Sequence, residues 1–244
     1  MPEFVCGRHT VFHLLSAGRR KGLCLHLLKG SEQERAELVE IARKLLVPVR
    51  FEAPAFFSSK LPPGISHQGV ALEVAPYPYL PLDELLSESF LLVLDEIQDP
   101  QNLGALCRSA YLFGVGGVVI PETHAAPIGP GSLQASVGAI EYLKISQVSS
   151  IAKILELLKK NNFWVYGADQ EGDRTIYDEA YPEKVALVIG GEEKGLRRLV
   201  RERCDLLVKI PTVGKEIGSL NASVAGGVIL SEIFRQKSKK NSKT

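Results

Sequence analysis

With 244 residues, 45% of them hydrophobic and 23% charged, the sequence has a globular composition that excludes an intrinsically disordered chain. No apolar run approaches the ~20 residues that span a bilayer, and the opening MPEFVCGRHTVFHLL lacks the features of a secretory signal. We therefore expect a cytoplasmic protein without a membrane partner. Residues 1–75 carry ten basic and seven acidic side chains, residues 76–231 fourteen and twenty, and residues 232–244 five and one. Basic ends suit contact with a polyanion, although solvated surface charge gives the same pattern.

The cysteines and histidines point away from metal and disulfide chemistry. The four cysteines are far apart and form no CxxC pair, and the five histidines are scattered. We expect reduced, mostly buried thiols and no metal site.

The first third of the chain predicts a small α/β domain over residues 1–75. An amphipathic stretch at residues 10–16 and a charged helix through residues 36–45 alternate with apolar strands at residues 23–28, in VPVRF and in GVALEV. The prolines of VAPYPYLPLDELLSES then predict an extended linker over residues 76–89.

The remaining chain predicts a larger α/β domain over residues 90–236. The apolar runs FLLVLDEI, GGVVI, LKISQV, FWVYGAD, VALVIG and DLLVKIP alternate with helical patterns such as SIAKILELLKKN and NASVAGGVILSEIFRQ. Continuous apolar strands between helices indicate a parallel sheet covered on both faces. The lysine-rich residues 237–244 are expected to form a disordered tail.

Ligands of open parallel sheets bind beyond the carboxyl ends of the strands, and the first unusual loop there is DEIQDPQNLGALCRSA. Asn102 is expected to cap a helix on which Arg108 lies one turn after Gly104. Taken alone, this pattern is that of a capped helix whose arginine reaches water.

The second unusual loop is ALVIGGEEKGLRRL, in which Gly190, Gly191 and Gly195 follow an apolar strand and allow a ligand or another backbone to come close. The loop lacks the Lys-Ser/Thr of a P-loop. The glycines of FGVGGVV precede a strand instead of following one, so they form no dinucleotide fingerprint. Both observations disfavour a nucleotide-dependent oxidoreductase or an NTPase.

The third unusual loop is IPTVGKEIGSLNASVAGG at residues 210–227. Ser219 and Asn221 are both suitable helix caps, and the small residues that follow require close packing. A tight helix–helix contact within the chain, a subunit contact and a ligand all fit this pattern.

Together, these loops resemble the three motifs of the SpoU (TrmH-type) branch of the SPOUT RNA 2′-O-ribose methyltransferases. The shared patterns are N-x-G-A-x-x-R-S-A, I-G-G-E-x-x-G-L and I-P followed by S-L-N-x-S-V-A. The resemblance implies an S-adenosylmethionine-dependent enzyme, a homodimer, and a carboxy-terminal helix threaded into a trefoil knot.

The amino-terminal part is similar to the ribosomal-protein-like substrate-binding domain of the ribosomal-RNA members of this family, through VCGRHTVFHLL, VPV and SHQGVALEV. This favours a 23S rRNA guanosine methyltransferase of the RlmB type. A tRNA 2′-O-ribose methyltransferase and a non-catalytic knotted RNA-binding homologue are the alternatives.

The resemblance also assigns roles to positions of this sequence. The catalytic positions that it implies are Arg108, Asn102, Glu192, Ser219 and Asn221. The cofactor positions are Gly190, Ile210 and Leu220, with Gly191 and Gly195 of the same glycine loop. Because a guanidinium stays protonated, Arg108 is expected to hold the RNA rather than act as a base, with Glu192 orienting it.

Overall fold

The computed structural model describes residues 3–31, 33–214 and 219–241, which form two compact units. Unit 1 consists of Met1–Pro78 and Pro127–Tyr142, and unit 2 consists of Tyr79–Ala126 and Leu143–Thr244. The segment 127–142, which lies in the sequence between two strands of unit 2, is therefore part of unit 1.

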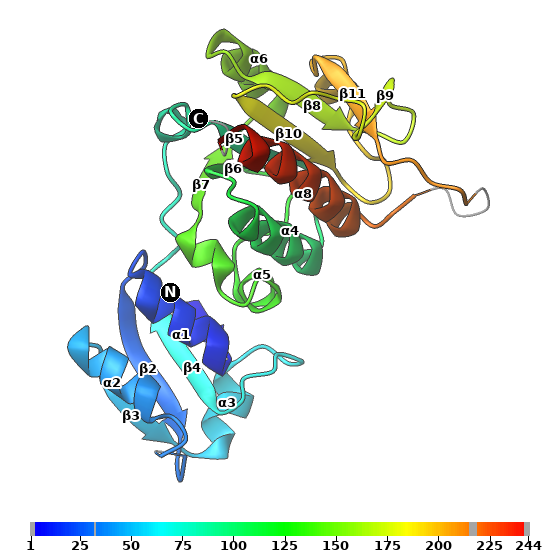
Figure 1. Cartoon of the computed structure of the whole chain (residues 1–244). Helices are drawn as coiled ribbons and strands as arrows, with labels where there is room; N and C mark the ends of the chain where they lie inside the picture. Colours follow the sequence, from blue (N-terminus) through cyan, green and yellow to red (C-terminus); the bar gives the residue numbers. More distant parts are fainter. Residues whose placement is uncertain (1–2, 32, 215–218, 242–244) are drawn as a thin grey trace. The chain divides into compact units, whose positions relative to one another are not determined.

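Unit 1 contains a mixed four-stranded sheet in the order β1-β4-β2-β3, which confirms the predicted small α/β fold (Figure 1). β4 pairs antiparallel with β1 and β2, and β2 pairs parallel with β3. The elements β1, α3, α5 and η2 were not predicted. The elements are β1 (Glu3–Cys6), α1 (Arg8–Ala17), β2 (Gly22–Leu28), α2 (Ala36–Lys44), β3 (Val49–Glu52), α3 (Pro54–Lys60), β4 (Val70–Val74), α5 (Pro130–Ala135) and the 3-10 helix η2 (Ala139–Tyr142).

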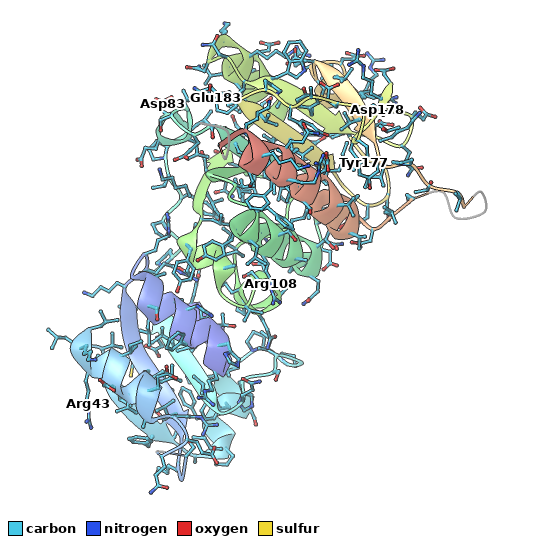
Figure 2. The ribbon with its side chains drawn as sticks, viewed as in Figure 1. Arg43, Asp83, Arg108, Tyr177, Asp178 and Glu183 are labelled. Atoms are coloured by element: carbon cyan, nitrogen blue, oxygen red, sulfur yellow. The ribbon has the colours of Figure 1, made fainter. Side chains whose placement is uncertain are left out.

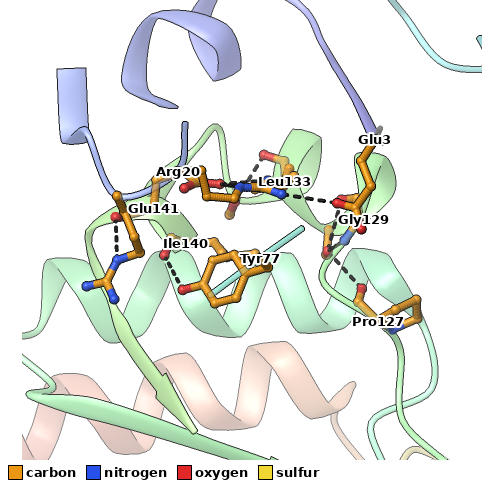
Figure 3. A network of polar contacts seen from close by, with 11 residues as sticks. Glu3, Arg20, Tyr77, Pro127, Gly129, Leu133, Ile140 and Glu141 are labelled. Carbon is orange, nitrogen blue, oxygen red and sulfur yellow. Dashed lines mark hydrogen bonds and ion pairs between the residues drawn. The ribbon is translucent and has the colours of Figure 1, made fainter. Parts of the chain in front are cut away.

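The segment 127–142 is fixed within unit 1 by a buried ion pair (Figure 3). The Arg20 and Glu141 side chains are fully buried, and Arg20 Nε donates to Glu141 Oε1 at 2.9 Å. Arg20 also pairs with Glu3 at 3.1 Å and lies 5.4 Å from the centroid of the Tyr77 ring. The Tyr77 hydroxyl donates to the Ile140 carbonyl at 3.2 Å. Residues distant in the sequence thus form one polar network.

Unit 2 contains a parallel seven-stranded sheet in the order β7-β6-β5-β10-β8-β11-β9, as predicted from the continuous apolar runs. Its strands are β5 (Phe90–Asp95), β6 (Gly117–Pro121), β7 (Lys144–Val148), β8 (Trp164–Ala168), β9 (Arg174–Thr175), β10 (Val185–Gly190) and β11 (Leu206–Lys209). Its helices are the 3-10 helix η1 (Leu82–Leu85), α4 (Pro100–Leu112), α6 (Ile151–Lys160), α7 (Arg198–Arg201) and α8 (Ala222–Asn241). The short strand β9 was not predicted.

The strand order places a switch point between β5 and β10. From β5 the chain continues to β6 and β7 on one side, while β10 and the remaining strands lie on the other side. The loops that follow β5 and β10 therefore leave the sheet in different directions. Such a point is the usual ligand site of an open parallel sheet.

Helices cover the sheet of unit 2 on both faces. α6 packs through Ile151, Leu155 and Leu158 into a cluster that includes residues of β5, β6 and β10. α4 and α8 lie side by side on the other face (Figure 1), and α8 also contacts β10. A Cβ at Gly226 would lie 2.3 Å from Leu106 Cδ2, so the small residues of α8 serve the contact with α4.

The structure differs from the sequence-based expectations at two segments. The expected linker is partly folded, because η1 buries Leu85 in the core of unit 2. The expected tail is helical through Asn241, because Lys237 and Lys240 donate to the carbonyls of Glu183 and Tyr181. Residues 242–244 lie outside the described residues. Residues 215–218 also lie outside them, and the implied knot stays a prediction.

Candidate active site

The loop after β10 folds back on itself over residues 190–195. The Gly195 amide donates to the Gly191 carbonyl at 3.0 Å, and Gly195 has a φ of +62°, a left-handed conformation that favours glycine. A Cβ at Gly190 would lie 2.1 Å from the carbonyl carbon of Gly195. These glycines are therefore required by the shape of the loop.

The third motif begins α8 with Asn221 as its cap. Asn221 Oδ1 accepts from the amides of Ser223 at 2.9 Å and Val224 at 3.3 Å. This decides between the two expected caps, since Ser219 makes no such contact among the described residues. Asn221 thus has a structural role in the helix start, and it is exposed.

A cavity of about 500 Å³ lies in unit 2 where β8, β10 and β11 end. Its wall combines the glycine loop, the end of β11 and the start of α8. Seven of the ten predicted site residues line it, namely Gly190, Gly191, Glu192, Gly195, Ile210, Ser219 and Leu220. Asn102, Arg108 and Asn221 do not.

The first motif approaches this cavity through Asn102 rather than through Arg108. The buried Asn102 amide donates to Glu192 Oε1 at 2.5 Å and to Asp99 Oδ2 at 3.4 Å. The expected cap is corrected: Asp99 begins α4 by accepting from the Gln101 amide at 2.9 Å, because Pro100 occupies the first helical position.

Arg108 lies on the exposed side of α4, where Figure 2 labels it. No described residue forms a hydrogen bond or an ion pair with its guanidinium. The expected contact from Glu192 to Arg108 is therefore absent, since Glu192 accepts from Asn102 instead. Arg108 is free to meet a group from outside its own chain.

Asp95 and Arg197 form a contact beside the cavity that the sequence did not predict, between a buried carboxylate and a partly exposed arginine. Asp95 ends β5 with a fully buried side chain. Its carboxylate accepts from the Arg197 backbone amide at 3.0 Å and from Arg197 Nε at 2.8 Å. The hydrogen bond from Arg197 to Asp95 raises the pKa of the guanidinium, which stays charged. The available signal was a single acidic residue closing the apolar run FLLVLD.

Charged side chains after β8 form another wall of the cavity. Arg201 Nε lies 3.4 Å from Asp169 Oδ2, and Arg201 Nη2 lies 3.4 Å from Glu171 Oε2. All three residues line the cavity, and none was predicted. The signal for Asp169 was its position directly after the apolar run FWVYGA.

The cavity suits a ligand of mixed polarity, such as a nucleoside carrying an amino-acid chain. Its volume lies in the ~300–1,000 Å³ range of small-molecule sites. Ile189, Ile210, Leu220 and Ile229 offer apolar surface, while backbone groups of the glycine loop and nearby carboxylates offer polar contacts. Because no side chain fits at Gly190, only backbone atoms are present at the end of β10.

Two family profiles match the chain in succession. The profile of RNA 2′-O ribose methyltransferase substrate binding matches residues 4–80, and that of the SpoU rRNA methylase family matches residues 89–231.

Among the described residues, no helix is long and apolar enough to cross a membrane.

Named relatives match over nearly the whole chain. The 23S rRNA (guanosine-2′-O-)-methyltransferase RlmB of Photorhabdus laumondii is 37% identical, covering 98% of this chain and 100% of its own. The protein of the same name from Escherichia coli is 35% identical with the same coverage. The SpoU methyltransferase AviRb from Streptomyces viridochromogenes, crystallised with the cofactor AdoMet, is 27% identical with a TM-score of 0.82, covering 97% of this chain and 90% of its own. The protein described here belongs to the SpoU rRNA methylase family.

Proposed function

We propose that this protein transfers the methyl group of S-adenosylmethionine to a ribose 2′-hydroxyl of RNA, and that the acceptor is a guanosine of 23S ribosomal RNA. The observation that carries the proposal is the cavity at the carboxyl ends of β8, β10 and β11, where the second and third motifs meet. The proposal is supported by the full-length relatives that carry the name of this reaction.

The cavity is proposed to hold the cofactor, which supplies an electrophilic methyl group when bound. The glycine loop leaves backbone amides and carbonyls accessible, while Ile210 and Leu220 provide apolar contact. Glu192 and Ser219 stand at the polar part of the wall. The Asn102 amide holds Glu192 by a charge-assisted hydrogen bond, so the first motif supports the loop of the second.

Arg108 is proposed to bind the RNA rather than to remove a proton. A guanidinium offers only donors and stays protonated, so it can hold a phosphate or stabilise the developing charge on the ribose oxygen. The ribose proton then leaves to water or to an RNA phosphate. The exposed position of Arg108 and its lack of a partner among the described residues support this role.

The amino-terminal part, predicted as residues 1–75, is proposed to bind ribosomal RNA. The matched substrate-binding profile and the excess of basic residues support this assignment. We assign methyl transfer to residues 90–236 and place the reaction in the cytoplasm, where this substrate would be met. The segment 127–142, which packs in unit 1, is part of the RNA-binding unit in this proposal.

The active form is proposed to be a homodimer through the outer side of α4 and α8. Leu112, Val224 and Phe234 expose large apolar surface there, and a hollow of about 450 Å³ runs between α8 and Tyr177. Exposed apolar patches of this kind mark interaction sites, and a second copy would cover this one.

The cavity can be tested separately from the substrate. Ala225 lines the cavity on α8, so Ala225→Leu should fill it and weaken S-adenosylhomocysteine binding by about tenfold in calorimetry. Ala180→Leu, at an exposed position outside the cavity, is the control. Unchanged affinity in Ala225→Leu would remove the cofactor from this cavity.

The substrate is tested by mapping ribose methylation in RNA from cells that lack the protein, before and after it is restored. We expect one guanosine of 23S rRNA to lose and regain its methyl group. A change confined to tRNA would support the tRNA alternative. An unchanged methylation map, with RNA binding retained, would support a non-catalytic homologue.

A further inference from the structure

We propose that Arg197 is a positioning residue that closes the glycine loop into the shape that binds the cofactor. The loop of residues 190–197 would start and end at the same corner of the sheet, which Asp95 and Glu96 form at the end of β5. The contacts of Arg197 with this corner would hold the two ends of the loop together. This inference rests on the proposed cofactor cavity and adds a residue that none of the three motifs assigns.

The start of the loop lies at the end of β5. In the sheet register Gly190 pairs with Asp95, the last residue of that strand. A Cβ on the next residue, Gly191, would lie 2.7 Å from the carbonyl oxygen of Glu96, so the two backbones touch as they leave the sheet. Glu96 itself has a φ of +62°, which is uncommon for a residue with a side chain.

The end of the loop returns to the same two acidic residues. Arg197 Nη2 lies 2.6 Å from Asp95 Oδ1, and Arg197 Nη1 lies 3.0 Å from Glu96 Oε1. With the backbone amide and Nε, one residue contacts this corner through four nitrogen atoms. The planar guanidinium fixes direction as well as distance, which a lysine ammonium does not.

Burial makes this contact obligatory. Asp95 is 0% exposed, and every side-chain hydrogen bond that it accepts from the described residues comes from Arg197. A buried carboxylate without a partner is strongly unfavourable, so Asp95 holds Arg197 against the end of β5. The Arg197 side chain as a whole remains 43% exposed.

Most of the loop lines the cavity, whereas Leu196 packs into the core of unit 2. Gly190, Gly191, Glu192, Glu193, Lys194 and Gly195 all line the cavity. Arg197 does not line it and therefore acts through the loop. Releasing the closing contact should widen the set of loop conformations, of which only some bind the cofactor.

The test compares Arg197→Ala with Arg198→Ala in the full chain. Arg198 is the next residue, has an 86% exposed side chain and pairs only locally with Glu202, so it is a matched control. We expect Arg197→Ala to weaken S-adenosylhomocysteine binding by about tenfold in calorimetry well below the unfolding temperature, and Arg198→Ala to change it less than about twofold. In steady-state assays the KM for S-adenosylmethionine should rise while kcat changes little.

Two milder variants keep the test decisive if Arg197→Ala does not fold. Arg197→Lys retains the charge opposite Asp95 but loses the forked geometry, and Glu96→Gln removes one of the two ion pairs. Both should give intermediate affinity losses. Wild-type affinity in both variants would overturn the inference, as would a lower unfolding temperature of Arg197→Ala with unchanged affinity.

The cavity-filling Ala225→Leu separates this inference from the proposed cofactor site. If Ala225→Leu weakens binding and the Arg197 variants do not, the site stands and the role of Arg197 is wrong. If none of them weakens binding, the cavity itself is misassigned.

Discussion

The position of Arg108 in the structure bears directly on its proposed role in catalysis. Arg108 lies outside the cavity and forms no hydrogen bond or ion pair with a described residue, so its removal should disturb little within the chain. We expect Arg108→Ala to lower methyl transfer by about 100-fold or more, the usual loss for a group that stabilises developing charge. S-adenosylhomocysteine affinity measured by calorimetry should stay unchanged.

The matched control for this prediction is again Arg198→Ala, another exposed arginine of unit 2. It should retain the wild-type rate of transfer from radiolabelled S-adenosylmethionine. Near-wild-type transfer by Arg108→Ala would exclude Arg108 from catalysis and leave its alternative, an arginine that only reaches water.

The cysteines give a second prediction at this scale. Burial raises the pKa of Cys6 to about 11 and the pKa values of Cys107 and Cys204 to about 12. At about pH 8 these groups are therefore thiols rather than reactive thiolates. Iodoacetamide should modify the folded protein slowly, as mass spectrometry would report, and all four cysteines should react in concentrated guanidinium chloride. Rapid alkylation of Cys204 in the folded protein would contradict this.

At the scale of elements, segment 127–142 depends on the ion pair between Arg20 and Glu141. Glu141→Leu leaves a buried arginine with only Glu3 as its ionic partner, and it should lower the free energy of unfolding by ~3–5 kcal/mol. Arg20→Met combined with Glu141→Leu removes both buried charges and should recover most of that loss. Chemical denaturation measures both variants. An additive loss in the double variant would show that the packing, rather than the unpaired charge, determines the cost.

The strands and helices were predicted well from the sequence where they depend on a local pattern of apolar residues. All six long strands of unit 2 were predicted from their apolar runs, because a strand that is buried on both faces consists mostly of apolar residues. β9 was missed because its two residues, Arg174 and Thr175, are too few to form a pattern. The packing of segment 127–142 in unit 1 was missed because it depends on partners that lie far away in the sequence.

The residues of the candidate site likewise fall into those that a local pattern predicts and those that it does not. The glycines of the second motif were identified from their place after a strand, whereas Asp95 and Arg197 are joined across about 100 residues and no local pattern connects them. The two adjacent glycines of FGVGGVV, at the start of a strand, have a packing role in the structure. A Cβ at Gly117 would lie 2.7 Å from Leu85 Cγ, so Gly117 accommodates η1, and a Cβ at Gly116 would collide with the Glu88 side chain.

At the scale of the whole molecule, the proposed dimer depends on the apolar side of α4 and α8. Phe234 is 43% exposed, and the centroid of its ring lies 5.9 Å from that of Phe113. Neither residue lines the proposed cofactor cavity, which includes Ala225. Phe234→Glu should therefore yield a monomer in light scattering while S-adenosylhomocysteine still binds. Lys239→Glu, on an exposed part of the same helix, controls for the change of charge. A dimer in Phe234→Glu would move the interface elsewhere.

In the proposed dimer, Arg108 could serve the cavity of its own chain or that of the partner. Since Arg108 does not line the cavity of its own chain, we expect it to act with the cavity of the partner. At an S-adenosylmethionine concentration well below its KM, the Ala225→Leu homodimer should have about a tenth of the wild-type activity, because it binds the cofactor about tenfold more weakly, and the Arg108→Ala homodimer about a hundredth or less. After subunit exchange, half of the dimers combine one chain of each kind, and the intact cavity of such a dimer faces an intact arginine. Activity should then rise to about a quarter of the wild-type level. If Arg108 served its own cavity, no mixed dimer would contain a complete site, and the activity of the mixture would stay at the average of the two homodimers.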